Sequence, residues 1–355
     1  ADDLDVHTDV GPCNTSMFIV DSAGKFRVVL NFKPLNSRIK DDTCELPCIQ
    51  GLFDRIAKSN AVVFSKIDLK QAFLQIPLRL KDRNATAFTF NNTRYRFVTA
   101  PLGLKTMPSI FQRWIAALLQ KKGCNNFAVN FVDDIIIFSN SVDENVEHVK
   151  AVLNALTEYN LTIAAEKFVF CATAIPVLGL WLDMKGVRPN YSKLLNMLEW
   201  ERPSTQKQKL RLLGILNYFR KFVRNFAEVV TPIREIMGKT FVWEKQKGAE
   251  EALRKVYKLL VDDGPFLYFP VKKVPLELAT DASAHAIAGT LFQVVEGKTI
   301  ILGYVSRVLK DAERNYSIPK KEFIAVVYCI LYFEEYLKYA TFKLHCFQVC
   351  GEHFG

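Results

Sequence analysis

The chain has 355 residues, of which 50% are hydrophobic and 24% charged, so it is a globular protein of two or three domains rather than a disordered one. It contains no run of 18 or more apolar residues, which excludes a membrane span and argues against a membrane partner. The net charge of +10 is concentrated between residues 185 and 263, a segment with 17 Lys and Arg but 9 Asp and Glu. Such a segment favours contact with phosphate backbones, although solvated helix faces would give the same count.

The first element expected along the chain is a strand over residues 25–36, which ends near Pro34. It carries Arg27, whose guanidinium suits phosphate oxygens because it can donate two parallel hydrogen bonds to them. An arginine on a strand can equally be a surface residue. The residue type alone therefore leaves a phosphate-binding role and a solvated role open.

A second strand is expected over residues 61–69, an apolar run that closes on the lone acid Asp68. Phe73 follows five residues after this acid. One aromatic residue among 27 Phe is often only part of a core. The spacing of Phe73 from Asp68 therefore indicates a functional role for Phe73 only if Asp68 is itself part of a functional site.

The next elements are predicted from turn and capping signals. Residues 86–97 are expected to form two strands joined by a turn at Asn91-Asn92. Pro108 fits the first turn of a helix with an apolar face. Ser141 and Glu144 form a capping box that opens another helix. The apolar faces of these helices indicate a core and, by themselves, nothing more.

The Asp133-Asp134 pair is the most informative feature, because it lies inside the apolar run of residues 130–138. That run predicts a buried hairpin, and burying two ionised carboxylates there costs several kcal/mol unless something compensates. A divalent cation would compensate, since hard cations prefer carboxylate oxygens; a solvated Asp-Asp turn is the alternative. An acid on one strand and an acid pair on a later hairpin form the arrangement that a two-metal nucleotidyl transferase needs, with ions about 3.5–4 Å apart.

Beyond residue 185 the composition becomes basic and helical, and a proline-rich junction follows at residues 266–275. Residues 276–283 then predict a strand that carries Asp281. The last element expected is a helix over residues 320–337, with Glu322 near its start.

In their order and spacing these blocks, from about Lys25 to about Leu344, resemble the reverse transcriptases of gypsy-class (Metaviridae) LTR retrotransposons or of endogenous derivatives of them. The resemblance implies an α+β fold: a right-hand polymerase with fingers, palm and thumb, followed by a truncated RNase H-like α/β domain. The implied domains are fingers and palm at residues 1–184, a basic helical thumb and connection at 185–265, and a partial RNase H-like domain at 266–355. The acidic start of the chain is expected to be the cut edge of a polyprotein.

The same resemblance implies roles for individual residues. Asp68, Asp133 and Asp134 would be the catalytic acids and would bind two Mg²⁺ ions, with Mn²⁺ as the alternative ion. Phe73 would lie under the sugar and reject a ribose 2′-hydroxyl, and Lys167 would be the general acid for the pyrophosphate leaving group. The implied nucleotide-binding residues are Arg27, Leu69, Phe73, Leu102, Gly103, Gln112 and Lys167. The implied primer- and template-binding residues are Gly179, Trp181, Lys207, Arg211, Arg220 and Lys221.

The RNase H-like part resembles its family less completely. Asp281 and Glu322 stand where two of the family's acids stand, but a third acid is implied near Phe347, where the sequence has none. We therefore expect RNase H activity to be lost and this part to dock on the thumb and contact the hybrid. Two further departures from the family bear on nucleotide binding. The fingertip at residues 19–24 lacks the lysines that the family usually has there, and Asn31 stands where the family commonly has an Asp.

The function expected is that of an RNA-directed DNA polymerase that adds dNTPs to a DNA primer on an RNA or DNA template. Its expected partners are the RNA template, the DNA primer, their RNA–DNA hybrid and dNTPs, and a homo- or heterodimer stays open. The expected location is the cytoplasm, in a virus-like particle, or the nucleus. Two alternatives remain: a domesticated or decayed retroelement protein that binds hybrids without catalysis, and a structural subunit of a heterodimeric reverse transcriptase.

Overall fold

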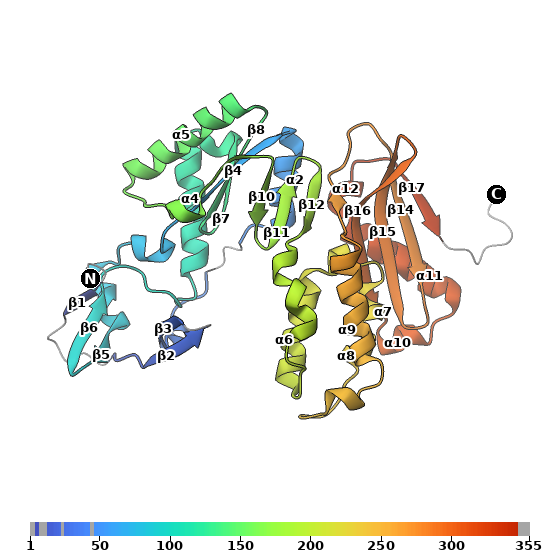
Figure 1. The fold of residues 1–355 in the computed structure, drawn as a ribbon, viewed down its shortest axis with the longest axis horizontal. Coiled ribbons are helices and arrows are strands. Elements are labelled where there is room, and N and C mark those ends of the chain that lie inside the picture. The colour runs from blue at the N-terminus through green and yellow to red at the C-terminus, as the bar shows by residue number, and fades with distance from the viewer. Residues whose placement is uncertain (1–3, 7–12, 23–24, 43–45, 347–355) are drawn as a thin grey trace. The chain divides into compact units, whose positions relative to one another are not determined.

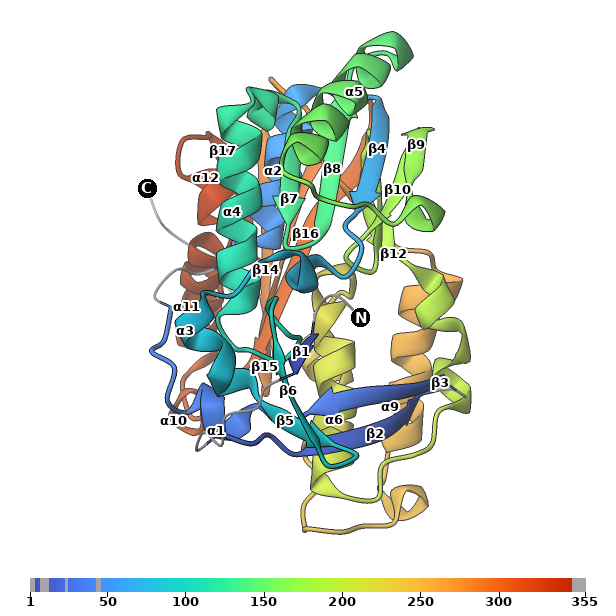
Figure 2. The same ribbon diagram turned by 90° about the vertical axis from the view of Figure 1, so that its left-hand side faces the viewer.

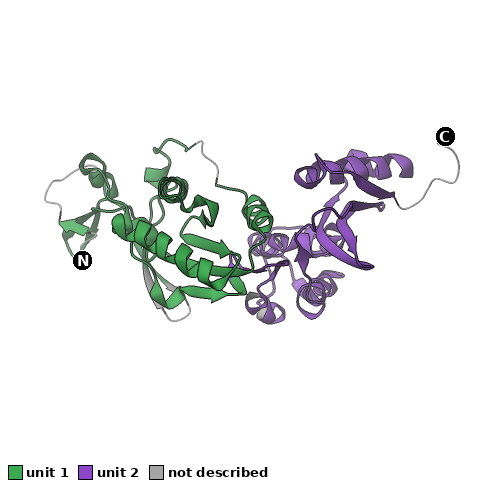
Figure 3. Cartoon of the chain, turned by 90° about the horizontal axis from the view of Figure 1, so that it is seen from above, with its two compact units in different colours: residues 1–175 green, residues 176–355 purple. Residues whose placement is uncertain are grey.

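A computed structural model describes residues 4–6, 13–22, 25–42 and 46–346 of the chain (Figure 1). The chain divides into two compact units, residues 1–175 and residues 176–355 (Figure 3). The second unit holds both the expected thumb and the expected RNase H-like part, while the finer division at residues 184 and 265 stays a prediction. None of the helices in the described ranges is long and apolar enough to cross a membrane.

The centre of the first unit is a four-stranded antiparallel sheet with helices on both faces. Its elements are β4 (Val63–Asp68), β7 (Ala128–Phe131), β8 (Asp134–Ser139), β9 (Val169–Ala172), α2 (Ile49–Ser59), α4 (Met107–Lys121) and α5 (Val142–Glu158). The strand order is β7-β8-β4-β9, so β4 and β8 are central and their apolar runs are covered on both sides. Figure 2 shows α4 and α5 in front of this sheet and α2 behind it. Ile115 of α4 and Val152 of α5 meet Ile137 of β8 in one buried core.

The starts of the two front helices follow the predicted signals. Pro108 lies in the first turn of α4. At the start of α5, the Ser141 Oγ accepts a hydrogen bond from the Glu144 N–H at 3.2 Å. Both helix starts are therefore confirmed, and they fix where the apolar face of each helix begins.

Two smaller sheets complete the first unit, one in the order β1-β6-β5 and one formed by β2 and β3. Their elements and the short helices near them are β1 (Leu4–Val6), β2 (Met17–Ser22), β3 (Lys25–Leu30), β5 (Phe88–Phe90), β6 (Thr93–Phe97), α1 (Lys33–Asn36) and α3 (Leu80–Arg83). The turn between β5 and β6 is made by Asn91 and Asn92, with φ angles of 46° and 57°. Asparagine tolerates this left-handed backbone, which confirms the predicted turn.

The second unit opens with a hairpin sheet followed by helices. These elements are β10 (Ala174–Val177), β11 (Leu180–Asp183), β12 (Gly186–Pro189), β13 (Leu267–Tyr268), α6 (Gln206–Tyr218), α7 (Phe226–Val229), α8 (Thr231–Arg234) and α9 (Ala249–Tyr257). The proline-rich junction contributes β13, which pairs with β12. At Gly186 a Cβ would lie 2.0 Å from the Leu267 carbonyl oxygen, so only glycine allows this pairing.

The unit ends in a second sheet, in the order β16-β15-β14-β17, with β17 parallel to β14. Its elements are β14 (Leu276–Ala282), β15 (Ala286–Val295), β16 (Lys298–Val308), β17 (Phe342–Cys346), α10 (Asp311–Arg314), α11 (Ile318–Tyr332) and α12 (Glu334–Leu337). Cys329 of α11 packs with Leu278 and Leu291 in the core of this sheet. Burial raises the pKa of the Cys329 thiol to about 12. The strand predicted for this region is confirmed, whereas the single helix predicted over residues 320–337 is divided at Phe333 into α11 and α12.

Candidate active site

The turn between β7 and β8 presents the Asp133-Asp134 pair. Phe131 and Asp134 are the last cross-strand partners, so Val132 and Asp133 form a two-residue turn. Val132 has a φ of 55°, a left-handed conformation that is costly for a β-branched residue. Asp133 is exposed in this turn, whereas Asp134 is half-buried at the start of β8.

Asp68 joins the pair through the register of β4 and β8. Asp68 and Asp134 are direct cross-strand partners. The N–H of Leu69 donates a hydrogen bond to the Asp133 carbonyl at 3.1 Å. The structure thus brings together, at the ends of neighbouring strands, the three acids on which the sequence interpretation rests.

Two of the three carboxylates are paired with lysines. Lys167 Nζ lies 3.1 Å from Asp68 Oδ1, and Lys66 Nζ lies 2.8 Å from Asp134 Oδ1. The hydrogen bond to Asp68 raises the pKa of Lys167, and the charges of Asp68 and Asp133 raise it further. Burial raises the pKa of Asp134, an effect that its hydrogen bond with Lys66 opposes.

Asp68 and Asp133 are the two carboxylates of the site that could hold a cation. Both acids line one pocket of about 360 Å³, both favour the charged form of the Lys167 ammonium, and the Asp133 carboxylate has no hydrogen-bond or ion-pair partner among the described residues. Across the described part of the chain, no group of three or more His, Cys, Asp or Glu side chains could hold a metal ion. The donor set is therefore a carboxylate pair, which suits Mg²⁺ because that ion keeps several waters and uses one or two carboxylates.

The walls of this pocket include four of the residues predicted to bind the nucleotide: Leu69, Phe73, Leu102 and Lys167. The Phe73 ring packs edge-on against Phe111 with 5.8 Å between ring centroids, which fixes its orientation. Leu102 is 67% exposed, whereas Leu69 is 2% exposed and buries its side chain in the core. Only the backbone of Leu69 is therefore left to face the pocket.

Gly103 follows Leu102 and has a φ of 99°. Its carbonyl accepts a hydrogen bond from Asn36 Nδ2 at 2.8 Å, which ties this loop to the end of α1. A left-handed backbone of this kind favours glycine. The loop beside the pocket is therefore held by its backbone, and the nucleotide-binding role expected for Gly103 stays a prediction.

Gln112 departs from its predicted role. Its side chain is 7% exposed, and it binds the backbone of β7: the Gln112 Oε1 accepts from the Val132 N–H at 2.6 Å. Its Nε2 donates to the Asn130 carbonyl at 3.0 Å. The expectation that this amide binds the nucleotide is corrected, because both ends of the amide are used by the hairpin.

Arg27 lies in the β2–β3 hairpin, where its backbone is opposite Val20. Its side chain lies outside the described residues. The phosphate-binding role expected for Arg27 stays a prediction.

In the second unit, the hairpin of β10 and β11 is tied to α6. Its turn contains Leu178 and Gly179, with φ angles of 49° and 78°. The Tyr218 hydroxyl, at the end of α6, donates a hydrogen bond to the Leu178 carbonyl. Trp181 is half-buried opposite Arg188 of β12. The predicted primer-binding hairpin and the predicted thumb helix are thus mechanically connected.

The exposed face of α6 carries Lys207, Arg211 and Gly214. A Cβ built at Gly214 would meet nothing within 4 Å, so no internal packing requires this glycine. Glycine inside a helix costs about 1 kcal/mol relative to alanine. An open, basic face with a glycine at its centre is suited to a partner whose backbone approaches closely.

Arg220 does not share that face. Its guanidinium donates to the Ser306 carbonyl of β16, and the Ala227 N–H donates to the Ser306 Oγ at 2.9 Å. Lys221 Nζ lies 5.4 Å from the Phe222 ring centroid. The Arg220 guanidinium thus joins the thumb helices to the C-terminal sheet, and the duplex contacts expected for Arg220 and Lys221 stay predictions.

The C-terminal sheet brings Asp281 and Glu322 within electrostatic range. Burial raises the pKa of Glu322, and the charge of Asp281 raises it further. The Glu322 Oε2 is buried without a hydrogen-bond partner among the described residues. The position near Phe347, where a third acid was expected, lies outside the described residues.

Two residues of the site were not predicted, Lys66 and Val132. Strand alternation was a signal for Lys66, because residues 66 and 68 of one strand point to the same face. No sequence pattern indicates the left-handed backbone of Val132, since a β-branched residue is the least expected one there.

The whole chain has the fold of solved right-hand polymerases that carry an RNase H-like domain. A foamy viral protease-reverse transcriptase (dRH) in complex with double-stranded DNA aligns with a TM-score of 0.82 at 20% identity, over 98% of this chain and 60% of that one. A foamy viral protease-reverse transcriptase in complex with an RNA/DNA hybrid aligns with a TM-score of 0.79 at 20% identity, over 98% of this chain and 46% of that one. The predicted fold class is confirmed.

The chain belongs to the reverse transcriptase family. The family described as reverse transcriptase (RNA-dependent DNA polymerase) matches residues 16–215, and the RNase H-like domain found in reverse transcriptase matches residues 243–344. The Tf2-3 transposon polyprotein of Schizosaccharomyces pombe is 31% identical over 323 residues, which are 91% of this chain and 24% of the polyprotein. The Pol polyprotein from transposon gypsy of Drosophila melanogaster is 29% identical over 354 residues, 95% of this chain and 33% of the polyprotein. The chain thus spans a quarter to a third of the length of these relatives.

Proposed function

We propose that this chain is an RNA-directed DNA polymerase that extends a DNA primer with dNTPs on an RNA or DNA template by two-metal nucleotidyl transfer. The observation that carries the proposal is the convergence of Asp68 and Asp133 on one pocket, beside an aromatic ring and a protonated lysine. Membership of the family supports it, as do solved relatives of the same fold in complex with double-stranded DNA and an RNA/DNA hybrid.

Asp68 and Asp133 would hold the Mg²⁺ ions, with Asp134 in a supporting place and Mn²⁺ as the alternative ion. When bound, the ions polarise the attacked phosphate and stabilise charge on its oxygens. The Lys66 ammonium pairs with the half-buried Asp134 and opposes the rise in its pKa that burial causes. The exposed Asp133 is left free for the ions and the substrate.

Lys167 is placed to assist the leaving pyrophosphate. Its Nζ is protonated at neutral pH, as in an ordinary lysine, and the hydrogen bond to Asp68 raises its pKa further. Its side chain is 61% exposed and, among the residues that the structure describes, forms one ion pair, with Asp68, so it can turn to a phosphate once Asp68 is neutralised. From there it can donate a hydrogen bond or a proton to the pyrophosphate oxygens.

Phe73 would select the sugar of the incoming nucleotide. Its ring lines the pocket of the two acids and is braced by Phe111. A braced ring under the sugar cannot yield to a 2′-hydroxyl, which is the group that distinguishes a ribonucleotide. The proposed substrates are therefore dNTPs.

The duplex would be held by the exposed face of α6 through Lys207 and Arg211, with sequence-independent contacts to phosphates. RNase H activity is proposed to be absent, because two ions need about four carboxylates and the sequence has Phe347 where the third acid is implied. The C-terminal domain would then act through its attachment to the thumb at Ser306.

Primer extension on poly(rA)·oligo(dT) with Mg²⁺ tests the proposal. Wild type should extend the primer, and Asp133→Asn should lower the rate at least about 10³-fold while its Kd for the hybrid changes less than about threefold. Asp143→Asn, an exposed acid beyond the other end of β8, is the matched control and should keep full activity. Full activity of Asp133→Asn would refute the assignment.

Hybrid binding without catalysis is the competing function, and one observation favours it: lysines already neutralise both Asp68 and Asp134. That function predicts a wild-type protein that binds the hybrid and extends no primer with Mg²⁺ or Mn²⁺. The same assay therefore separates the two functions.

A further inference from the structure

We propose that Gln112 is a positioning residue of the polymerase site: its amide holds the strained turn that carries Asp133. This inference rests on the proposed function and adds a residue that acts through the backbone without touching the substrate. It concerns α4, β7 and the turn between β7 and β8, all within the first unit.

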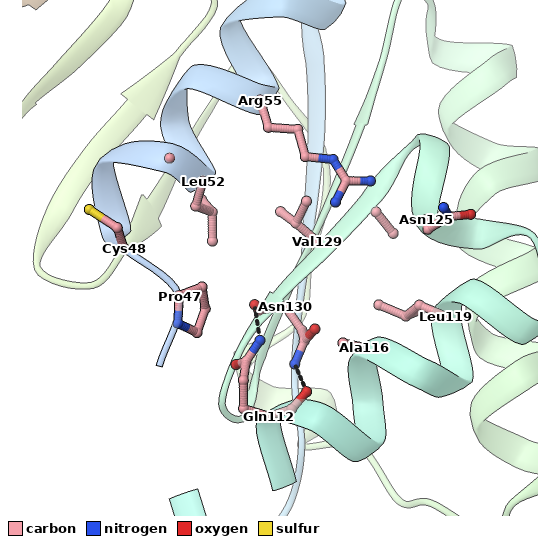
Figure 4. A pocket seen from close by; sticks show the side chains of 12 residues that line it. Pro47, Cys48, Leu52, Arg55, Gln112, Ala116, Leu119, Asn125, Val129 and Asn130 are labelled. Carbon is pink, nitrogen blue, oxygen red and sulfur yellow. Dashed lines mark hydrogen bonds between the residues drawn. The ribbon is translucent and has the colours of Figure 1, made fainter. Parts of the chain in front are cut away.

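Gln112 and the edge of β7 are joined by three hydrogen bonds. The Gln112 Oε1 accepts from the Val132 N–H at 2.6 Å, and its Nε2 donates to the Asn130 carbonyl at 3.0 Å. In return, the Asn130 Nδ2 donates to the Gln112 carbonyl at 3.2 Å. Figure 4 shows the two bonds that join Gln112 and Asn130. The two side chains are 7% and 6% exposed, so water does not compete freely for these bonds.

The sheet leaves these backbone groups without another partner. The strand order places β7 at the edge of the sheet, so the Asn130 carbonyl and the Val132 N–H face away from β8. These groups are two residues apart along the chain, at the end of β7 and in the turn after it, and they point to the same side, where a neighbouring strand would normally pair with both. The Gln112 amide offers one acceptor and one donor and replaces that missing strand. If these bonds are not made, the buried backbone groups have lost water without gaining a partner, which is unfavourable.

The Gln112 amide binds Val132, the residue of the turn with the strained backbone. Val132 has a φ of 55°, which a β-branched residue leaves readily unless its surroundings hold it. Asp133 is the next residue, and its carbonyl is bonded to the Leu69 N–H beside Asp68. Relaxation at Val132 would therefore move the Asp133 carboxylate relative to Asp68. A misplacement of about 1 Å at a reacting centre costs roughly 10²-fold in rate.

The same helix also braces the nucleotide pocket. Phe111, the residue before Gln112, packs against the Phe73 ring. Through neighbouring residues, α4 therefore supports the aromatic wall of the pocket and the turn that carries its acid. A change confined to position 112 separates the second role from the first.

Position 112 has room for a substitution that removes the amide without disturbing the surrounding packing. Gln112 and Asn130 line a pocket of about 270 Å³ between α2, α4 and β7, with Leu52 and Arg55 on the far wall (Figure 4). A methionine of similar length fits there without displacing the core. Gln112→Met thus removes the donor and the acceptor and leaves the packing of Phe111 in place. Gln112→Glu keeps the acceptor for the Val132 N–H and loses the donor to Asn130.

The test combines primer extension with hydrogen exchange at the Val132 amide. For Gln112→Met we expect kcat to fall 10- to 100-fold, with dNTP KM and hybrid Kd within threefold of wild type, and Val132 exchange to become at least tenfold faster. Gln112→Glu should keep Val132 protected and retain at least three times the kcat of the Met variant. Gln120→Met, at an exposed position of the same helix, should change nothing.

A kcat within twofold of wild type in Gln112→Met, or unchanged Val132 exchange, would overturn the proposal. If Gln112→Met does not fold, the comparison of Gln112→Glu with wild type tests the proposal. If neither variant folds, the proposal is overturned, and Gln112 is a residue required for stability instead. A wild type without primer extension would refute the proposed function alone. In that case the exchange measurement still shows whether Gln112 holds the turn.

Discussion

Asp68 and Asp134 stand opposite each other in the register of β4 and β8, yet their carboxylates are bonded to different lysines. The lysine of Asp68, Lys167, has a side chain that is 61% exposed, whereas the lysine of Asp134, Lys66, is 15% exposed. An exposed ammonium is easily exchanged for another cation, and a half-buried one is not. The site therefore contains one replaceable positive charge and one permanent positive charge.

Lys66→Met should destabilise the first unit, because it leaves the half-buried Asp134 carboxylate without its partner. We expect the free energy of unfolding at pH 7 to fall by roughly 3 kcal/mol, measured by urea denaturation. Adding Asp134→Asn removes the unpaired charge and should recover most of that loss, which makes a double-mutant cycle informative. Strictly additive effects of the two changes would mean that the ion pair contributes nothing.

The hairpin and the strand of Asp68 could be predicted because each combines an apolar run with acids at its end, and register then brings the acids together. The hydrogen-bond partners of polar side chains could not be predicted in this way. The helical period places Gln112 on the buried side of α4, but it does not say that the amide pairs with an edge strand. Likewise, a charge count treats Lys209 as a surface residue, although it is 6% exposed and donates to the Ile236 carbonyl at 2.7 Å. Such interactions depend on how distant elements meet, which local patterns do not specify.

Phe73→Val should relax the choice of sugar. Removing the ring opens the pocket wall beside the two acids, so we expect kcat/KM for rNTPs relative to dNTPs to rise at least about tenfold. Single-nucleotide incorporation with matched dNTP and rNTP measures this ratio. Phe90→Val, at a 47% exposed position of β5, is the control and should leave the ratio unchanged. An unaltered ratio in Phe73→Val would reduce Phe73 to a packing residue.

Lys207→Gln with Arg211→Gln should weaken binding to the duplex in a salt-dependent way. For each phosphate that the protein no longer neutralises, the slope of log K against log salt should become shallower by about 0.9, measured by fluorescence anisotropy over a range of KCl concentrations. Arg220→Gln is the contrasting variant, because its guanidinium is bonded to the Ser306 carbonyl. It should leave the slope unchanged and lower the stability of the second unit. An equal change of slope in both variants would show that Arg220 also binds the duplex.

The Arg307–Glu313 pair should set the acid stability of the C-terminal domain. Arg307 Nη1 and Nη2 lie 2.6 Å and 2.9 Å from the two oxygens of Glu313, and this hydrogen-bonded pair lowers the pKa of Glu313 from 4.5 to about 2. Because the folded state has the lower pKa, the stabilisation is complete above the unfolded value of 4.5 and is lost as the pH falls toward 2.

Glu313→Gln should therefore lower the free energy of unfolding at pH 7 by roughly 1.5–3 kcal/mol, and the difference from wild type should shrink at pH 3. Urea denaturation of both proteins at the two pH values measures it. Glu334→Gln breaks an exposed helix pair with Lys338 and should cost less than about 0.5 kcal/mol at either pH. A Glu313→Gln effect of the same size at pH 3 and pH 7 would assign the stabilisation to packing, since only the charged carboxylate loses its contribution on protonation.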